Sequence, residues 1–165
     1  MKFITVPITE DMRRRAMKHA DPLDRGRFVT ALSWVALKRA FPKTRLVNHD
    51  GGFDVRFRGK LYEVRGDLTR TAPNMGHQHC VFKIRGDVFR YLMVKVSYDK
   101  RVAWIIGRIS KARFLKQSQF FKAGKRMRLP TGHFYVCERT AYHLPVSELA
   151  LFSEKTLRAV KDRLL

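Results

Sequence analysis

Cysteines, acidic residues and long apolar segments are all scarce in this sequence, and each shortage excludes a class of protein. Cys80 and Cys137 are the only cysteines among 165 residues, so no disulfide framework is expected and both thiols are predicted to stay reduced. No apolar run approaches the roughly 20 residues of a membrane-spanning helix. The opening stretch MKFITVPITEDMRRR has no apolar region of signal-peptide length. We therefore expect a cytoplasmic protein without a membrane partner.

Familiar catalytic and cofactor-binding motifs are absent as well. The sequence has no phosphate-binding P-loop, no dinucleotide-binding glycine pattern, no G-x-S-x-G and no H-E-x-x-H. The histidines and cysteines that could bind a metal do not have the paired spacing of a structural zinc site. These residues are His77, His79, Cys80, His133 and Cys137. On a strand, His133 and Cys137 would lie ~13 Å apart. We expect Cys137 in the core and His77 or His79 in a loop near the active face.

Acidic residues are greatly outnumbered by basic ones. The chain has 35 Lys and Arg against 14 Asp and Glu, which gives a net charge of +21. The basic residues are spread along the whole chain, and such a field attracts polyphosphates, most often nucleic acid. No amphipathic basic helix indicates an anionic membrane surface instead. The alternatives are a generally basic, solvated surface and an acidic protein partner.

The residues that are present predict a folded α/β protein. Hydrophobic residues make up 45% of the chain and include twelve phenylalanines, enough for one core without metal or disulfide support. We find no repeat and no linker, so residues 1–165 form a single domain, with a core over 24–122 and a C-terminal strand and helix extension over 123–165. Periodicity and turn signals predict the following elements: strands over 3–8, 44–48, 91–98, 102–106 and 133–137; helices after Thr9, over 24–41, over 110–122 and after Ser153; turns at 49–52 and from Leu144; and a loop over 66–80.

The stretch FDVRFRGKLYEVR, residues 53–65, predicts a β-hairpin with Gly59-Lys60 at its turn. In this register Asp54 faces Arg65, and Arg56 faces Glu63. Because side chains alternate along a strand, the hairpin has one apolar and one polar face. The apolar face carries Val55, Phe57, Tyr62 and Val64, and the polar face carries Asp54, Arg56, Glu63 and Arg65. Such carboxylates can hold a divalent metal, or they can form cross-strand ion pairs worth a few tenths of a kcal/mol each.

A core helix followed by this hairpin, with Asp54 on the first strand and Glu63-Val64-Arg65 on the second, resembles the PD-(D/E)XK nuclease superfamily. That superfamily includes many restriction endonucleases and archaeal Holliday-junction resolvases. The resemblance covers about residues 26–115. It implies a restriction-endonuclease-like fold, in which helices flank a mixed central sheet.

The resemblance also implies a function: a DNA endonuclease that hydrolyses phosphodiester bonds with Mg²⁺ or Mn²⁺ bound by Asp54 and Glu63. Two carboxylates hold the cation, which activates water and neutralises charge that builds on the phosphate. Arg65 stands at the position of the family's lysine. Enzymes of this fold commonly cut duplex DNA as symmetric dimers, so a homodimer is implied, with DNA rather than RNA as the partner.

Two departures from the family pattern leave a second interpretation open. A guanidinium such as that of Arg65 cannot release a proton at a useful pH, so Lys95 or Lys83 would have to supply the lysine from a neighbouring element. The acid that many relatives carry on the first core helix is also missing between Arg25 and Phe41. The alternative is a DNA- or RNA-binding protein that keeps the fold but lacks a complete active site.

Ten basic residues are candidates for contact with nucleic acid: Arg56, Arg58, Lys60, Arg70, Arg108, Lys111, Arg113, Lys125, Arg126 and Arg128. Phosphate contacts are expected to dominate, because nothing resembles a recognition helix. Aromatic residues lie between the basic ones at Phe120, Phe121, Phe134 and Tyr135. Most of them are expected in the core, and stacking on exposed bases is the alternative.

Overall fold

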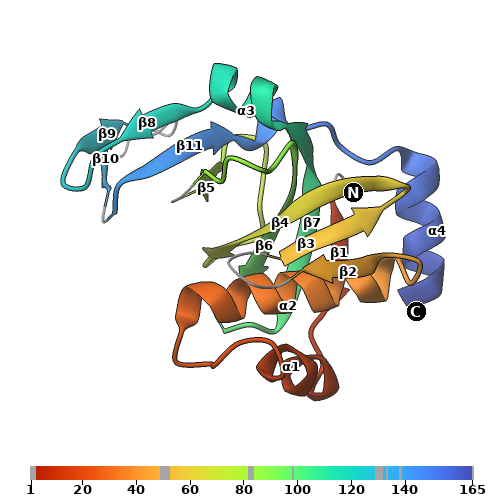
Figure 1. The fold of residues 1–165 in the computed structure, drawn as a ribbon. Coiled ribbons are helices and arrows are strands. Elements are labelled where there is room, and N and C mark those ends of the chain that lie inside the picture. The colour runs from red at the N-terminus through yellow and green to blue at the C-terminus, as the bar shows by residue number, and fades with distance from the viewer. Residues whose placement is uncertain are drawn as a thin grey trace.

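The computed structural model describes residues 3–48, 53–81, 84–97, 99–128, 132, 134–137 and 139–164. Within them the chain forms one α/β domain around a mixed six-stranded sheet (Figure 1). From edge to edge its strands are β1 (Ile4–Pro7), β7 (Val102–Ser110), β6 (Arg90–Ser97), β4 (Lys60–Thr69), β3 (Phe53–Phe57) and β2 (Arg45–Asn48). β4 and β6 are parallel, and the other neighbours are antiparallel. The α/β class and the mixed central sheet predicted from the sequence are confirmed.

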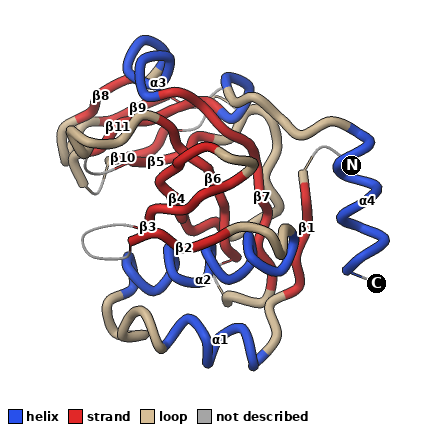
Figure 2. Tube along the Cα trace, turned by 45° about the vertical axis from the view of Figure 1, so that its right-hand side comes forward, coloured by secondary structure: helices blue, strands red, loops and turns tan. Residues whose placement is uncertain are grey.

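Helices cover one face of this sheet (Figures 1 and 2). They are α1 (Glu10–Met17), α2 (Arg25–Ala40) and α4 (Glu154–Leu164), and α2 lies across the strands. Asp24 caps α2 by accepting a hydrogen bond from the backbone N–H of Arg27 at 3.1 Å. Phe28 of α2 shares a core with Val55 and Val64 of the hairpin. This helix therefore packs against the apolar face of the hairpin.

Gly66 sets how closely α2 approaches the sheet. A Cβ atom at this position would lie 2.5 Å from the hydroxyl oxygen of Ser33 and 2.8 Å from the carbonyl oxygen of Val29, both in α2. Such contacts are too short for any real side chain, so only glycine fits between β4 and the helix. The acid-bearing strand is thus held directly against the main core helix.

The opposite face of the sheet is covered by smaller elements. These are a three-stranded sheet of β5 (Gln78–Val81), β11 (Ala141–Pro145) and β8 (Gln119–Phe121), the helix α3 (Lys111–Gln117) and a 3₁₀ turn (Val146–Glu148). A two-stranded ribbon, β9 (Arg126–Arg128) and β10 (Phe134–Val136), extends this side (Figure 1). Here a second core forms around Tyr91, Met93, Phe114 and Leu144. β6 consequently contributes buried side chains to both faces.

Several predicted elements differ from the structure, and tertiary pairing is the reason in each case. The loop predicted over 66–80 is wrong in part, because β4 continues to Thr69 alongside β6 and β5 forms at 78–81. The helix predicted over 110–122 ends at Gln117, because the chain then pairs with β11. The turn predicted from Leu144 lies in β11, a strand that the sequence analysis missed. The predicted turn at 49–52 lies outside the described residues.

Candidate functional site

The central hairpin forms as predicted, but its turn lies one residue earlier. Arg58 and Gly59 form the two-residue loop, with φ angles of 49° and 77°. Positive φ at both loop positions is the type I′ geometry that matches the twist of paired strands. The predicted register is therefore wrong, since Asp54 lies opposite Glu63 and not opposite Arg65. The register moved by two residues, so the predicted division into an apolar and a polar face still holds.

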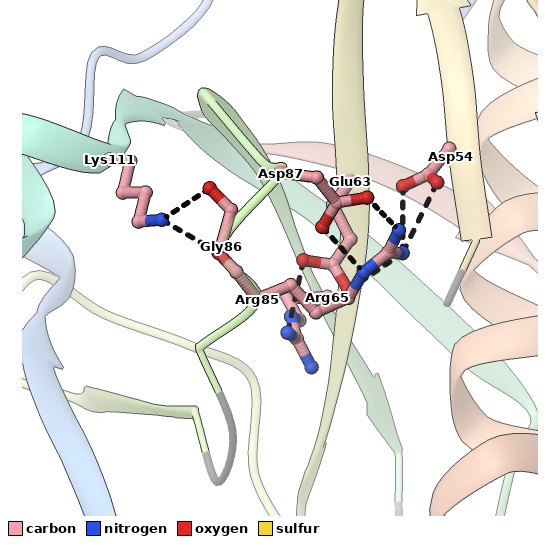
Figure 3. Close-up of polar contacts among 7 residues, drawn as sticks. All are labelled: Asp54, Glu63, Arg65, Arg85, Gly86, Asp87 and Lys111. Carbon is pink, nitrogen blue, oxygen red and sulfur yellow. Dashed lines mark hydrogen bonds and ion pairs between the residues drawn. The ribbon is translucent and has the colours of Figure 1, made fainter. Parts of the chain in front are cut away.

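Asp54 and Glu63 are two neighbouring, buried carboxylates on the polar face. The side chain of Asp54 is 12% exposed and that of Glu63 only 1%. Arg85 lies between them (Figure 3), and its Nη1 donates to both Asp54 oxygens at 3.2 Å and lies 3.8 Å from Glu63 Oε1. Arg65 Nη2 is 3.0 Å from Glu63 Oε2. One nitrogen of Arg85 thus contacts both acids.

Further polar contacts hold the loop that carries Arg85 in place. Arg85 also binds Asp87, with Nη2 2.6 Å from Oδ2. From the start of α3, Lys111 Nζ donates to the backbone carbonyls of Arg85 at 2.7 Å and Gly86 at 3.0 Å (Figure 3). The 84–89 loop therefore lies over the carboxylates. The sequence analysis missed Arg85, although Arg-Gly-Asp between two strands marks a turn with its own ion pair.

Burial raises the pKa of Glu63 above its ordinary value, although Arg65 and Arg85 act in the opposite direction. Desolvation penalises the charged form of a carboxyl group, and two nearby guanidinium groups only partly offset it. Arg65 is itself placed by Tyr91, whose ring centroid lies 5.8 Å from the guanidinium carbon. Arg65 therefore orients Glu63 and compensates part of its charge.

Lys95 lies beside a different acid. Its Nζ is 2.6 Å from Asp67 Oδ2, and the two residues face each other across the parallel pair β4 and β6. Asp67 follows Glu63 by four residues on the same strand, which corresponds to ~13 Å. The structure therefore does not bring Lys95 to the Asp54–Glu63 pair, where the sequence analysis had placed it. The alternative lysine, Lys83, lies outside the described residues.

Asp67 and Lys95 form a largely buried ion pair. Burial alone would raise the pKa of Asp67, but the ammonium charge of Lys95 and the hydrogen bonds from Lys95 and the Cys80 backbone contribute to holding this pKa below its ordinary value. The backbone N–H of Cys80 also donates to Asp67 Oδ2 at 3.2 Å. Asp67 is therefore held as a carboxylate by specific partners, and the pair ties β4 to β6.

A group of histidines and cysteines extends this buried polar region. Of the two histidines of which one was expected in a loop, His77 lies in the loop before β5, whereas His79 is fully buried on β5. Burial lowers the pKa of His79 to about 3. His143 lies between the two thiols, with Nδ1 3.5 Å from Cys80 Sγ and Nε2 3.8 Å from Cys137 Sγ. Burial raises the pKa of Cys80 to about 12, so its thiol stays protonated.

Cys137 lies in the core as predicted, and neither cysteine forms a disulfide. Among the residues that the structure describes, no three His, Cys, Asp or Glu side chains converge to hold a metal ion. His133 is not among these residues. His143, Cys80 and Cys137 therefore pack against one another within the described part of the chain.

The ten basic candidates do not form one uniform surface. Arg58 on the hairpin turn donates to Thr156 Oγ1 of α4 at 3.1 Å, Lys111 fastens the 84–89 loop, and Arg113 pairs with Glu148 at 3.8 Å. Arg108 is half-buried beside its backbone bridge to Ala150. The remaining six are exposed: Arg56, Lys60, Arg70, Lys125, Arg126 and Arg128.

Together the fold and the site define a strongly basic α/β protein with a buried carboxylate pair bridged by an arginine. Comparisons with protein-family models, with curated proteins and with solved structures found no match. Among the described helices, none is both long enough and apolar enough to cross a membrane.

Proposed function

We propose that this protein is a metal-dependent DNA endonuclease of restriction-endonuclease-like fold, with Asp54 and Glu63 as the ligands of Mg²⁺ or Mn²⁺. The observation that carries the proposal is the shared contact of both acids with Arg85 Nη1, at 3.2 and 3.8 Å. Carboxylates from adjacent strands already converge on one cationic atom. In the proposed active state Asp54 and Glu63 would hold a divalent ion in place of their contact with Arg85, and the ion would supply the Lewis acid for hydrolysis.

The chemistry of these residues fits a magnesium ion. Mg²⁺ keeps several water ligands and needs only one or two carboxylates from a protein. The raised pKa of Glu63 means that two arginines compensate its charge incompletely. A more compact divalent charge between Asp54 and Glu63 would compensate it better.

The residues around the acids have separate roles in this proposal. The bound cation would activate water and neutralise charge on the scissile phosphate. Arg65 holds the Glu63 carboxylate at 3.0 Å and keeps its own proton. The exposed basic residues bind phosphate groups along the DNA. From the resemblance we also propose a homodimer, which sedimentation of the purified chain would test. The proposed place of action is the cytoplasm.

Cleavage assays with matched carboxylate variants test the proposal. Labelled duplex, branched and single-stranded DNA, with RNA alongside, is incubated with Mg²⁺, with Mn²⁺ or with EDTA. Asp54→Asn and Glu63→Gln are expected to abolish metal-dependent cleavage. Asp87→Asn is the control, because this acid binds the same arginine but is 68% exposed and lies outside the carboxylate pair. Unchanged cleavage by a folded Asp54→Asn protein would refute the assignment.

A second candidate function is non-catalytic binding of nucleic acid, and one observation favours it. Lys95, one of the two lysines assigned to the acids from sequence, is instead 2.6 Å from Asp67. The carboxylate pair would then be a structural ion-pair network that stabilises β3, β4 and the 84–89 loop. A gel shift that persists in EDTA, with no cleavage of any substrate in Mn²⁺, would select this function.

A further inference from the structure

One continuous part of the chain is basic without any acidic residue. Residues 100–137 contain ten Lys and Arg and no Asp or Glu. This part includes β7, α3, β8 and the β9–β10 ribbon, which lies at one end of the molecule (Figure 1). This stretch has no carboxylate of its own to pair with its cations, although Arg101 pairs with Asp99 and Arg113 with Glu148 outside it. The excess of one sign of charge favours a polyanionic ligand.

The ribbon has an exposed face of unusual composition. β9 and β10 are antiparallel, with Phe134 opposite Arg128 and Val136 opposite Arg126. These four residues share one face, since side chains alternate along each strand. Both arginines are exposed, and Phe134 and Val136 are 57% and 53% exposed. We call this group the ribbon face.

The aromatic ring of Phe134 on this face contacts the guanidinium group of Arg126. The guanidinium carbon of Arg126 lies 4.0 Å from the centroid of the Phe134 ring, within the range of a cation–π contact. Phe120 on the neighbouring β8 is also 51% exposed. The expectation that most of the interleaved aromatics lie in the core therefore fails for these two residues.

We propose that the ribbon face binds unpaired nucleotides, so that the substrate class is single-stranded or branched nucleic acid. A flat ring beside two guanidinium groups suits a base and its phosphate: the base stacks on Phe134, and the phosphate pairs with Arg126 or Arg128. In a duplex the bases already stack on one another, so only the phosphate contacts remain. This inference rests on the part of the proposed function that names nucleic acid as the partner.

Binding measurements on the full-length chain in EDTA test this inference without interference from cleavage. The probes are an oligothymidylate of about 20 nucleotides, a duplex of equal length and a fork that joins both, each followed by fluorescence anisotropy at several salt concentrations. Phe134→Ala is expected to weaken binding of the oligothymidylate and the fork roughly 10-fold, and binding of the duplex less than about 2-fold. Phe134→Trp should bind the oligothymidylate at least as well as the unaltered protein.

Two control variants separate stacking from apolar contact and from charge. Val136→Ala removes an equally exposed side chain of the same face and is expected to change each affinity less than about 2-fold, because it has no ring to stack. Arg126→Gln should weaken binding of all three probes and lower the salt slope by about one.

The possible failures are distinguishable. If the unaltered protein binds none of the probes, the proposed function fails together with this inference. If it binds them but Phe134→Ala affects the oligothymidylate and the duplex equally, only the inference is overturned. Poly-glutamate bound as tightly as the oligothymidylate, with the same sensitivity to Phe134→Ala, would assign the face to an acidic protein and overturn the inference as well.

Discussion

Replacement of Arg85 tests directly whether the carboxylate pair is a cation site. The side chain of Arg85 is 16% exposed, and its Nη1 contacts Asp54 at 3.2 Å and Glu63 at 3.8 Å. In Arg85→Gln the positive charge is lost and the shorter side chain cannot bridge both acids. The pair then keeps Arg65 as its one remaining cation among the contacts described above.

The magnitude follows from the contact that a metal ion has to displace. A hydrogen bond between charged groups contributes about 1.5–3 kcal/mol, and these side chains are buried enough for little solvent screening. A metal that no longer has to break it should bind about 10- to 150-fold more tightly, at 1.4 kcal/mol per tenfold change. Without metal, the same variant should lose about 2 kcal/mol of stability, because the buried Glu63 carboxylate is less compensated.

Titration calorimetry with Mn²⁺ and urea unfolding in EDTA measure the two effects. Arg56→Gln is the matched control, because Arg56 is an exposed arginine on the same face of β3 and its replacement changes the net charge equally. We expect tighter Mn²⁺ binding only in Arg85→Gln. Equal dissociation constants for the unaltered protein and both variants would refute the proposed exchange of arginine for metal.

Three further predictions concern the buried parts of the fold. Lys95→Met leaves the Asp67 carboxylate without its ammonium partner and should lower the free energy of unfolding in urea by about 3–5 kcal/mol. Adding Asp67→Asn in a double variant should restore part of this loss. A loss below about 1 kcal/mol would contradict the ion pair. The folded-state pKa of His79 is about 3, against an ordinary value of 6.5, so the stabilisation by its neutral form is complete above pH 6.5 and is lost as the pH falls toward 3. Stability should decline by roughly 1.4 kcal/mol per pH unit in that interval, and an equally steep decline in His79→Leu would rule out this origin. Gly66→Ala places a Cβ atom 2.5 Å from a hydroxyl oxygen of α2 and should lower the free energy of unfolding by about 1–3 kcal/mol. Gly86→Ala is the control: no atom lies within 4 Å of its Cβ, so the free energy of unfolding should change by about 0.5 kcal/mol at most.

The turn of the central hairpin shows where local rules fall short. One glycine at position 59 is compatible with two registers, and the sequence analysis placed Gly59 first in the loop. In the structure it is second, because type I′ geometry requires positive φ at both positions and Arg58 adopts it at 49°. The shift of two residues left each side chain on its predicted face. The shared face of Asp54 and Glu63 was therefore predictable, although their cross-strand partners were not.

The exposed aromatics illustrate a second limit. Phe120 and Phe134 are apolar, and hydrophobicity alone assigns such residues to a core. Their exposure of 51% and 57% depends on where β8 and β10 lie relative to the rest of the fold. The ring of Phe134 contacts the guanidinium group of Arg126 there.

By itself the sequence determined the class of the fold, the main core helix, the polar face of the hairpin and the strongly basic surface. These follow from periodicity, turn residues and charge, which act over a few residues or over the whole chain. Tertiary structure alone decided that Arg85 reaches Asp54 across 31 residues and that Lys95 reaches Asp67 across 28. The physical reason is that such pairs depend on which strands become neighbours, and that outcome minimises the free energy of the whole packed chain.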